Sequence, residues 1–333
     1  MNTSLSLNTE ISRKFSCFML GFILIVILFH SDFLYYYPLI EDLTVVSTTY
    51  FFCVSAFFFY TELNRKSFTH CLKKRCITLL VPYLLWNILY LLFSLKRVPI
   101  TLPGIIRGFT ISTFCTPSWY LMTLFLFFLI APPVRYALQK KSTTLLLLAI
   151  GSLLSYLGYI KFQKELASLP FIGAYLVRMS IYFTAYLFGS AISTWLRHKL
   201  HVTRTSFILG ILSTCSIYIL LQKELLLETR WILWMLLPLT LWHSIPEALF
   251  KPFSFSQFFT EPAFFLNMIH CYLLFIWQNI TTKQEIITGK YLSALNIILT
   301  IITTYVLYYI LKSLLPGALQ YLVGKRNVKQ KGL

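Results

Sequence analysis

Charged residues are scarce in this chain of 333 residues: they make up 12% of it, against 57% hydrophobic residues. Soluble domains carry about a quarter charged residues, so this composition excludes an ordinary water-soluble protein. Acidic residues are the scarcest, with 11 Asp and Glu against 29 Lys and Arg, which gives a formal charge of +18. The basic residues lie in short loops and not in a stripe interleaved with aromatic residues, so we expect no nucleic-acid partner.

Metal-site and disulfide patterns are also missing from the sequence. The seven cysteines form no Cys-x-x-Cys pair, and most of them lie inside apolar runs, where we interpret them as small core residues. Cysteines and histidines do not cluster at the spacing of metal ligands, so no metal site is predicted. His198 and His201 come nearest, but a basic loop is typical of a solvated pair.

Long apolar runs are what the chain has instead. Each is long enough to cross a hydrocarbon core of about 30 Å, and backbone groups without water must be satisfied within helices. We therefore predict an all-α fold, a polytopic integral membrane bundle of about ten transmembrane helices. It would form a single domain over 1–333, with short cytoplasmic tails at 1–14 and 313–333. The predicted spans are 15–29, 43–60, 76–94, 119–137, 143–160, 171–196, 206–222, 231–243, 262–280 and 291–311.

The distribution of basic residues predicts the orientation. With the amino end inside, the loops that would face the cytoplasm carry more Lys and Arg than the opposite loops, as the positive-inside rule requires. Ten crossings would then leave both termini in the cytoplasm, and we expect a multi-pass protein of the inner (plasma) membrane. We find no pair of Gly/Pro-broken helices at matching positions in two halves, which counts against an inverted-repeat transporter.

Ionisable residues at helix depth are costly, so each one needs a partner or a function. His30 closes the first run near Asp32, and an imidazole oriented by a carboxylate can act as a general base, although an interfacial histidine fits the same position. Arg178 could hold a phosphate or carboxylate of a substrate, or it could snorkel to the interface or pair within the bundle. His270 shares a helix face with Asn267 and is either catalytic or a packing residue.

Two further segments are candidates for binding. The loop from Glu62 to Arg75 holds five basic residues, Arg65 among them, which would meet anionic lipid headgroups or the phosphates of a nucleotide-bearing donor. Three successive tyrosines, Tyr35 to Tyr37, offer a possible outer surface for a glycan.

Several short motifs occur in an order that resembles the acyltransferase-3 family of membrane enzymes, which includes polysaccharide O-acetyltransferases. The residues 72–83, LKKRCITLLVPY, are similar to the family's "KKRxxRLxxPY" segment and are the most specific match. The first run ending in His30 also resembles the family, as do four shorter stretches: 51–57, 117–121, Arg178 with Phe188-Gly189, and 268–270.

The resemblance implies a function and a set of site residues. Members take an acyl group, usually acetyl from cytoplasmic acetyl-CoA, and deliver it to a glycan hydroxyl at the outer face. Acetyl-CoA would be a co-substrate, and no permanently bound cofactor is expected. The candidate catalytic residues are His30 and His270. The candidate residues for binding substrate or coenzyme are Arg75, Arg178, Trp119, Tyr83 and Arg65.

The sequence departs from the family pattern at three positions. Met19 stands where an Arg or Lys is usual, Ala56 replaces a Gly, and Ser118 replaces a common His. Arg13 or Lys14, up to about two helical turns earlier, would be imperfect substitutes for the missing basic residue. Three alternatives therefore stay open beside O-acylation: N-acylation of an amino sugar, a carrier or flippase for a glycan or lipid-linked intermediate, and an inactive partner in envelope assembly. The acyl group, the glycan and the oligomeric state are not predicted.

Overall fold

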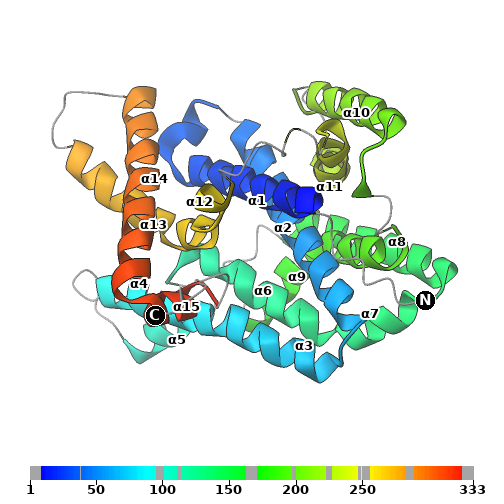
Figure 1. Ribbon diagram of the computed structural model, residues 1–333, viewed down its shortest axis with the longest axis horizontal. Helices are drawn as coiled ribbons and strands as arrows, with labels where there is room; N and C mark the ends of the chain where they lie inside the picture. The colour runs from blue at the N-terminus through cyan, green and yellow to red at the C-terminus, as the bar shows by residue number, and fades with distance from the viewer. Residues whose placement is uncertain are drawn as a thin grey trace.

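A computed structural model gives the arrangement of the chain (Figure 1). It describes residues 9–37, 39–94, 101–110, 114–162, 171–196, 200–222, 227–246, 249, 256–282 and 289–324. These residues form helices and their connections, with no strand among them, so the all-α prediction is confirmed. The predicted tails 1–14 and 313–333 lie outside the described residues at 1–8 and 325–333, and α1 already begins at Thr9.

Fifteen α-helices are found in the described part of the chain. The first eight are α1 (Thr9–His30), α2 (Leu39–Leu63), α3 (Phe68–Arg75), α4 (Val81–Ser94), α5 (Leu102–Thr110), α6 (Trp119–Leu129), α7 (Ala131–Ala137) and α8 (Lys141–Leu157). The others are α9 (Phe171–Ala191), α10 (Arg204–Gln222), α11 (Leu227–Ser244), α12 (Ser256–Thr260), α13 (Ala263–Thr281), α14 (Gly289–Leu314) and α15 (Pro316–Leu322). Short helical turns include η1 (Asp32–Tyr35), η2 (Cys76–Leu80), which joins α3 to α4, and η3 (Thr116–Ser118) before α6.

Seven helices in the described residues are long and apolar enough to cross a membrane, and an eighth span is formed if one bent pair is counted. The multi-pass architecture is thereby confirmed, whereas the number ten is not. The bent pair is α6 and α7, which meet at 56°. Proline occupies the first turn of α7, and because proline has no N–H to continue the ladder from α6, the predicted span 119–137 breaks there.

The helices pack in pairs that place α1 near the middle of the molecule. The pair α13–α14 forms one end in Figure 1, and the pair α10–α11 lies toward the other. Between them, α1 packs against both α2 and α13, while α2 packs against α9 and α11. Segments from the two ends of the sequence therefore meet at the carboxyl end of α1.

Small residues allow α2 and α9 to approach closely. A Cβ added to Gly189 would lie 1.9 Å from the carbonyl oxygen of Cys53. Ala56, one turn farther along α2, is fully buried. Helices in lipid associate through such close backbone contacts, because lipid tails provide no hydrophobic drive for association. The Phe188-Gly189 motif is thus explained by packing.

An apolar cavity of about 460 Å³ lies among α1, α2, α8, α9 and α11. Its lining includes Phe15, Tyr50, Phe57, Met235 and Trp242. None of the candidate site residues lines it, so this cavity and the candidate site are separate features of the bundle.

Candidate active site

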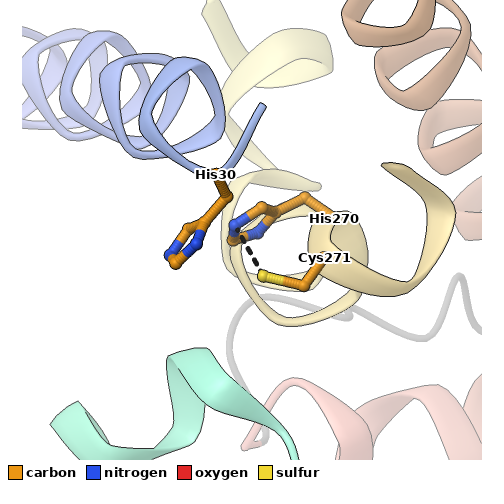
Figure 2. A group of neighbouring side chains, drawn as sticks. All are labelled: His30, His270 and Cys271. Atoms are coloured by element: carbon orange, nitrogen blue, oxygen red, sulfur yellow. Dashed lines mark hydrogen bonds between the residues drawn. The ribbon is translucent and has the colours of Figure 1, made fainter. Parts of the chain in front are cut away.

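The fold brings His30 and His270 together, although 240 positions separate them in the sequence. Their ring centroids lie 5.2 Å apart with the planes inclined at 44°. His30 is the last residue of α1 and is partly buried, whereas His270 lies inside α13 and is fully buried. Figure 2 shows the two imidazoles side by side with Cys271 next to them. The two residues predicted to be catalytic are therefore neighbours in the fold.

Hydrogen bonding fixes how His270 presents its nitrogens. Its Nδ1 lies 2.8 Å from the backbone oxygen of Asn267, an acceptor, so we assign the ring proton to Nδ1. The lone pair is then on Nε2, which lies 3.3 Å from Cys271 Sγ. Asn267, which was predicted to share this helix face, therefore contacts His270 through its main-chain oxygen.

Asp32, the carboxylate predicted to orient His30, and Asp42, an acidic residue in the first turn of α2, both have other hydrogen-bond partners. Gln278 donates a hydrogen bond of 3.3 Å to Asp32. Asp42 is buried in α2 and accepts a hydrogen bond of 3.0 Å from the indole N–H of Trp234. The ionisable neighbour found beside the His30 ring is therefore another imidazole.

A second cluster surrounds Arg178 on α9. Its guanidinium carbon lies 5.1 Å from the centroid of Trp119 and 5.4 Å from that of Tyr175, which are distances typical of cation–π contacts. Tyr83 and Tyr182 are close enough to interact electrostatically with the same charge. The Tyr83 hydroxyl itself donates to the carbonyl of Phe109. Three of the candidate binding residues, Arg178, Trp119 and Tyr83, are thus brought together.

The guanidinium of Arg178 has spare capacity for a ligand. Its Nη1 is buried and has no hydrogen-bond partner in the part of the chain that the structure describes. A buried donor of a permanent cation is costly when it is left unsatisfied. An anionic group of a substrate would satisfy it, and arginine is well suited to phosphate and carboxylate.

A chain of hydrogen bonds connects the surroundings of Arg178 with α13. Ser118, which immediately precedes Trp119, accepts a hydrogen bond of 2.9 Å from the Asn87 amide, and the Asn87 carbonyl accepts one of 3.2 Å from the Cys115 N–H. Cys115 Sγ lies 3.6 Å from the Met268 carbonyl oxygen, two residues before His270. Ser118, found where the family often has histidine, is fully buried in this network.

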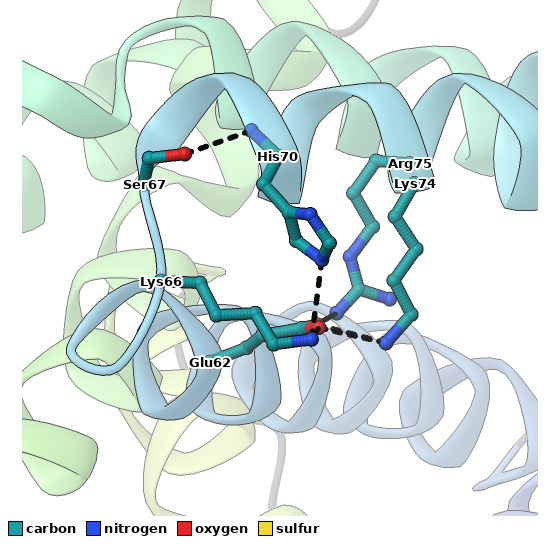
Figure 3. A network of polar contacts seen from close by, with 6 residues as sticks. All are labelled: Glu62, Lys66, Ser67, His70, Lys74 and Arg75. Carbon is teal, nitrogen blue, oxygen red and sulfur yellow. Dashed lines mark hydrogen bonds and ion pairs between the residues drawn. The ribbon is translucent and has the colours of Figure 1, made fainter.

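Arg75 and Arg65 lie apart from both clusters. Figure 3 shows Arg75 beside Glu62, which also pairs with Lys74 and Lys66. The Arg75 guanidinium lies 5.6 Å from the rings of both Phe59 and Phe128, and 3.3 Å from the Glu62 carboxylate. Its charge is therefore already offset by a carboxylate.

Arg65 is exposed in the turn between α2 and α3. Tyr35, Tyr36 and Tyr37 are also exposed, by 83%, 45% and 45%, as a contact surface requires.

Two basic residues of α1, Arg13 and Lys14, were predicted as substitutes for one at the position of Met19. Lys14 has another role in the structure, and Arg13 lies six residues before Met19. Met19 packs in an apolar cluster with Ile23 and Leu266. The ammonium of Lys14 is fully buried and donates to the carbonyls of Trp242 and Ile245, at 2.5 and 2.6 Å. These carbonyls lie at the end of α11, where a helix favours positive charge. The role of Lys14 in this structure is to hold α11.

Cys271, Tyr175 and Tyr182 lie at these clusters, and the sequence analysis did not select them. Cys271 lies inside an apolar run and looks like any other core cysteine. Its place directly after His270 in the sequence was the one indication. Adjacent residues on a helix do not face each other, so this place alone did not predict that the two side chains would be in contact. Tyr175 precedes Arg178 by three residues, a spacing that puts the two on one helix face.

The comparisons with known proteins bear on the whole bundle. A family model described as an acyltransferase domain matches residues 20–319. No curated protein matches the chain. No solved structure matches it either.

Proposed function

Because this chain belongs to the acyltransferase-3 family, we propose that its acyltransferase activity moves an acetyl group from acetyl-CoA to a hydroxyl of a cell-envelope glycan. The enzyme would act in the inner (plasma) membrane with both termini in the cytoplasm. Its donor would approach from the cytoplasm and its acceptor from the outer face. The observation that carries the proposal is the pairing of His30 with His270 at 5.2 Å.

His30 is the group that we assign to the acceptor hydroxyl. It is partly buried and ends its helix, so it can meet a substrate, whereas His270 is enclosed. A neutral imidazole takes the hydroxyl proton as the oxygen attacks the thioester carbon. The carbon–sulfur bond then breaks, and the coenzyme leaves as a thiolate that takes up a proton. His270 keeps a fixed tautomer beside His30 and is a positioning residue in this scheme.

Arg178 is the group that we assign to the donor. Its buried Nη1 has no hydrogen-bond acceptor among the described residues, and the phosphates of coenzyme A are anions that could accept this hydrogen bond. Trp119 and Tyr175 hold the guanidinium plane in place, which lowers the entropy lost when the anion binds. Arg75 already has Glu62 as a partner, so a phosphate of the coenzyme would have to compete with that carboxylate for Arg75.

Transfer of radiolabelled acetyl from acetyl-CoA to glycan tests the proposal directly. Membranes would carry the wild-type chain, His30→Ala, the exposed-histidine control His201→Ala, or no copy. We expect label on the glycan with wild type and His201→Ala, and a fall of about 100-fold or more with His30→Ala, as for loss of a general base.

Two outcomes would count against the proposal. Label that persists without the protein would overturn acetyl transfer, and movement of the glycan across the membrane without consumption of acyl-CoA would then be tested. Equal label with His30→Ala and wild type would remove His30 from catalysis and favour an assembly role.

A further inference from the structure

Three potential metal ligands converge at the carboxyl end of α1. One nitrogen each from His30 and His270 and the sulfur of Cys271 all lie within 4.8 Å of one another. Figure 2 shows that the first comes from α1 and the other two come from α13. Imidazole nitrogen and thiolate sulfur are the preferred ligands of Zn²⁺, and two His with one Cys is a known zinc ligand set.

One of the three ligand–ligand separations already matches that of a tetrahedral site. Zinc–nitrogen distances of about 2.0–2.1 Å and a zinc–sulfur distance of about 2.3 Å imply a nitrogen–sulfur separation of about 3.5 Å in a tetrahedral site. His270 Nε2 and Cys271 Sγ lie 3.3 Å apart. The lone pair of His270 is on the correct nitrogen, because Nδ1 faces the Asn267 carbonyl at 2.8 Å. A carbonyl in that position is the usual outer partner of a metal-bound histidine.

His30 has the freedom to complete the site. The widest separation, at most 4.8 Å, must shrink by roughly 1 to 1.5 Å to reach a tetrahedral edge. His30 ends α1 and is partly buried, so rotation of its side chain can supply this shift. Three protein ligands leave the fourth tetrahedral position for water or another oxygen.

We propose that His30, His270 and Cys271 bind one Zn²⁺ ion, and that the bound ion inhibits acyl transfer. Binding requires the Cys271 thiol to release its proton, after which two neutral imidazoles and one thiolate leave a net charge of +1 on the site. The ion takes the lone pair with which His30 would accept the proton of the acceptor hydroxyl. The inhibition rests on the proposed function, whereas the binding of zinc does not.

Metal content measures the binding without any substrate. The full chain, purified in detergent with a tag that lacks histidine, would be stripped with a chelator, loaded with Zn²⁺, desalted and analysed for zinc. We expect one zinc per wild-type chain and loss of that zinc in Cys271→Ser and His30→Gln. The matched control is Cys215→Ser, which changes an exposed cysteine of α10 and should keep the metal.

Cobalt substitution identifies the sulfur ligand. Loading with Co²⁺ should give a thiolate-to-cobalt charge-transfer absorption in wild type and in Cys215→Ser, and none in Cys271→Ser. If Cys271→Ser does not elute as a folded species, zinc-dependent protection of the wild-type Cys271 thiol from alkylation replaces it. That protection should disappear in His30→Gln.

Three results would overturn the site: a wild-type chain without zinc after loading, Cys271→Ser that keeps one zinc, or alkylation of Cys271 that zinc does not slow. Binding of zinc together with an absence of acetyl transfer would leave the site standing and would overturn the proposed function. Acetyl transfer that stoichiometric zinc does not inhibit would overturn the inhibitory role.

Discussion

Replacing Gly189 by alanine would insert a methyl group into the closest approach between α2 and α9. Its carbon would lie 1.9 Å from the Cys53 carbonyl oxygen, and 2.7 and 2.9 Å from the carbonyl carbon and Cα of that residue. All three obstacles belong to the backbone of α2, so no side-chain rotation can relieve the overlap. The two helices must therefore separate.

The size of the separation gives the expected cost. Ordinary contact begins at about 3.5 Å, so the interface must open by about 1.5 Å along this line. Overpacking of a dense core costs about 1–3 kcal/mol, and we expect the upper end because neither backbone can turn aside. The separation would also disturb a pair of stacked aromatic rings across the interface, because the ring centroids of Phe52 on α2 and Tyr182 on α9 lie 4.8 Å apart.

Thermal stability in detergent provides the assay. Purified Gly189→Ala would be heated, and the folded fraction would be followed by size-exclusion chromatography. The matched control is Gly21→Ala on α1, because a Cβ there meets nothing within 4 Å. Alanine is favoured over glycine inside helices by about 1 kcal/mol, so the control should be as stable as wild type or more stable. A midpoint for Gly189→Ala equal to that of Gly21→Ala would refute this account of the α2–α9 interface.

Three other experiments test further contacts. Lys14→Met should destabilise the fold by about 2 kcal/mol or more in thermal unfolding, because the carbonyls of Trp242 and Ile245 lose a buried donor; an unchanged midpoint would contradict this. Arg178→Lys should raise the KM for acetyl-CoA about tenfold or more with little change in kcat, because lysine has no planar guanidinium to lie against Trp119 and Tyr175, and an unaltered KM would exclude the donor role. Lys312 lies 2.7 Å from Glu261, and a double-mutant cycle of Lys312→Met with Glu261→Gln should give a coupling of about 1 kcal/mol, whereas zero coupling would show that the pair adds nothing.

Helix content and the general architecture could be predicted from composition and run length. Spans such as 43–60 and 291–311 correspond to α2 and α14, because a run of apolar residues fixes both its conformation and its environment. The number of membrane crossings was harder to predict from the sequence. Break points depend on local backbone chemistry, and the prolines that divide 119–137 into α6 and α7 show how one apolar run becomes two helices.

The candidate site could be predicted only residue by residue. His30, His270 and Arg178 stood out because each is an ionisable group in an apolar run. Their grouping could not be read from the sequence, since it depends on α1 packing against α13. For the same reason, the sequence spacing of cysteines and histidines did not indicate that His30, His270 and Cys271, from two distant helices, lie within 4.8 Å of one another.

The two hydrogen bonds from Lys14 to the end of α11 have a consequence for biosynthesis. Lys14 leaves the ribosome early, but its two acceptors are Trp242 and Ile245, the second of them 231 positions later. At about 5–20 residues per second, on the order of 10–50 seconds pass before those acceptors have been made. Until then, the Lys14 ammonium lacks the two carbonyl groups that accept its hydrogen bonds in the folded chain. The contact between Lys14 and the end of α11 therefore forms only after most of the chain has been synthesised.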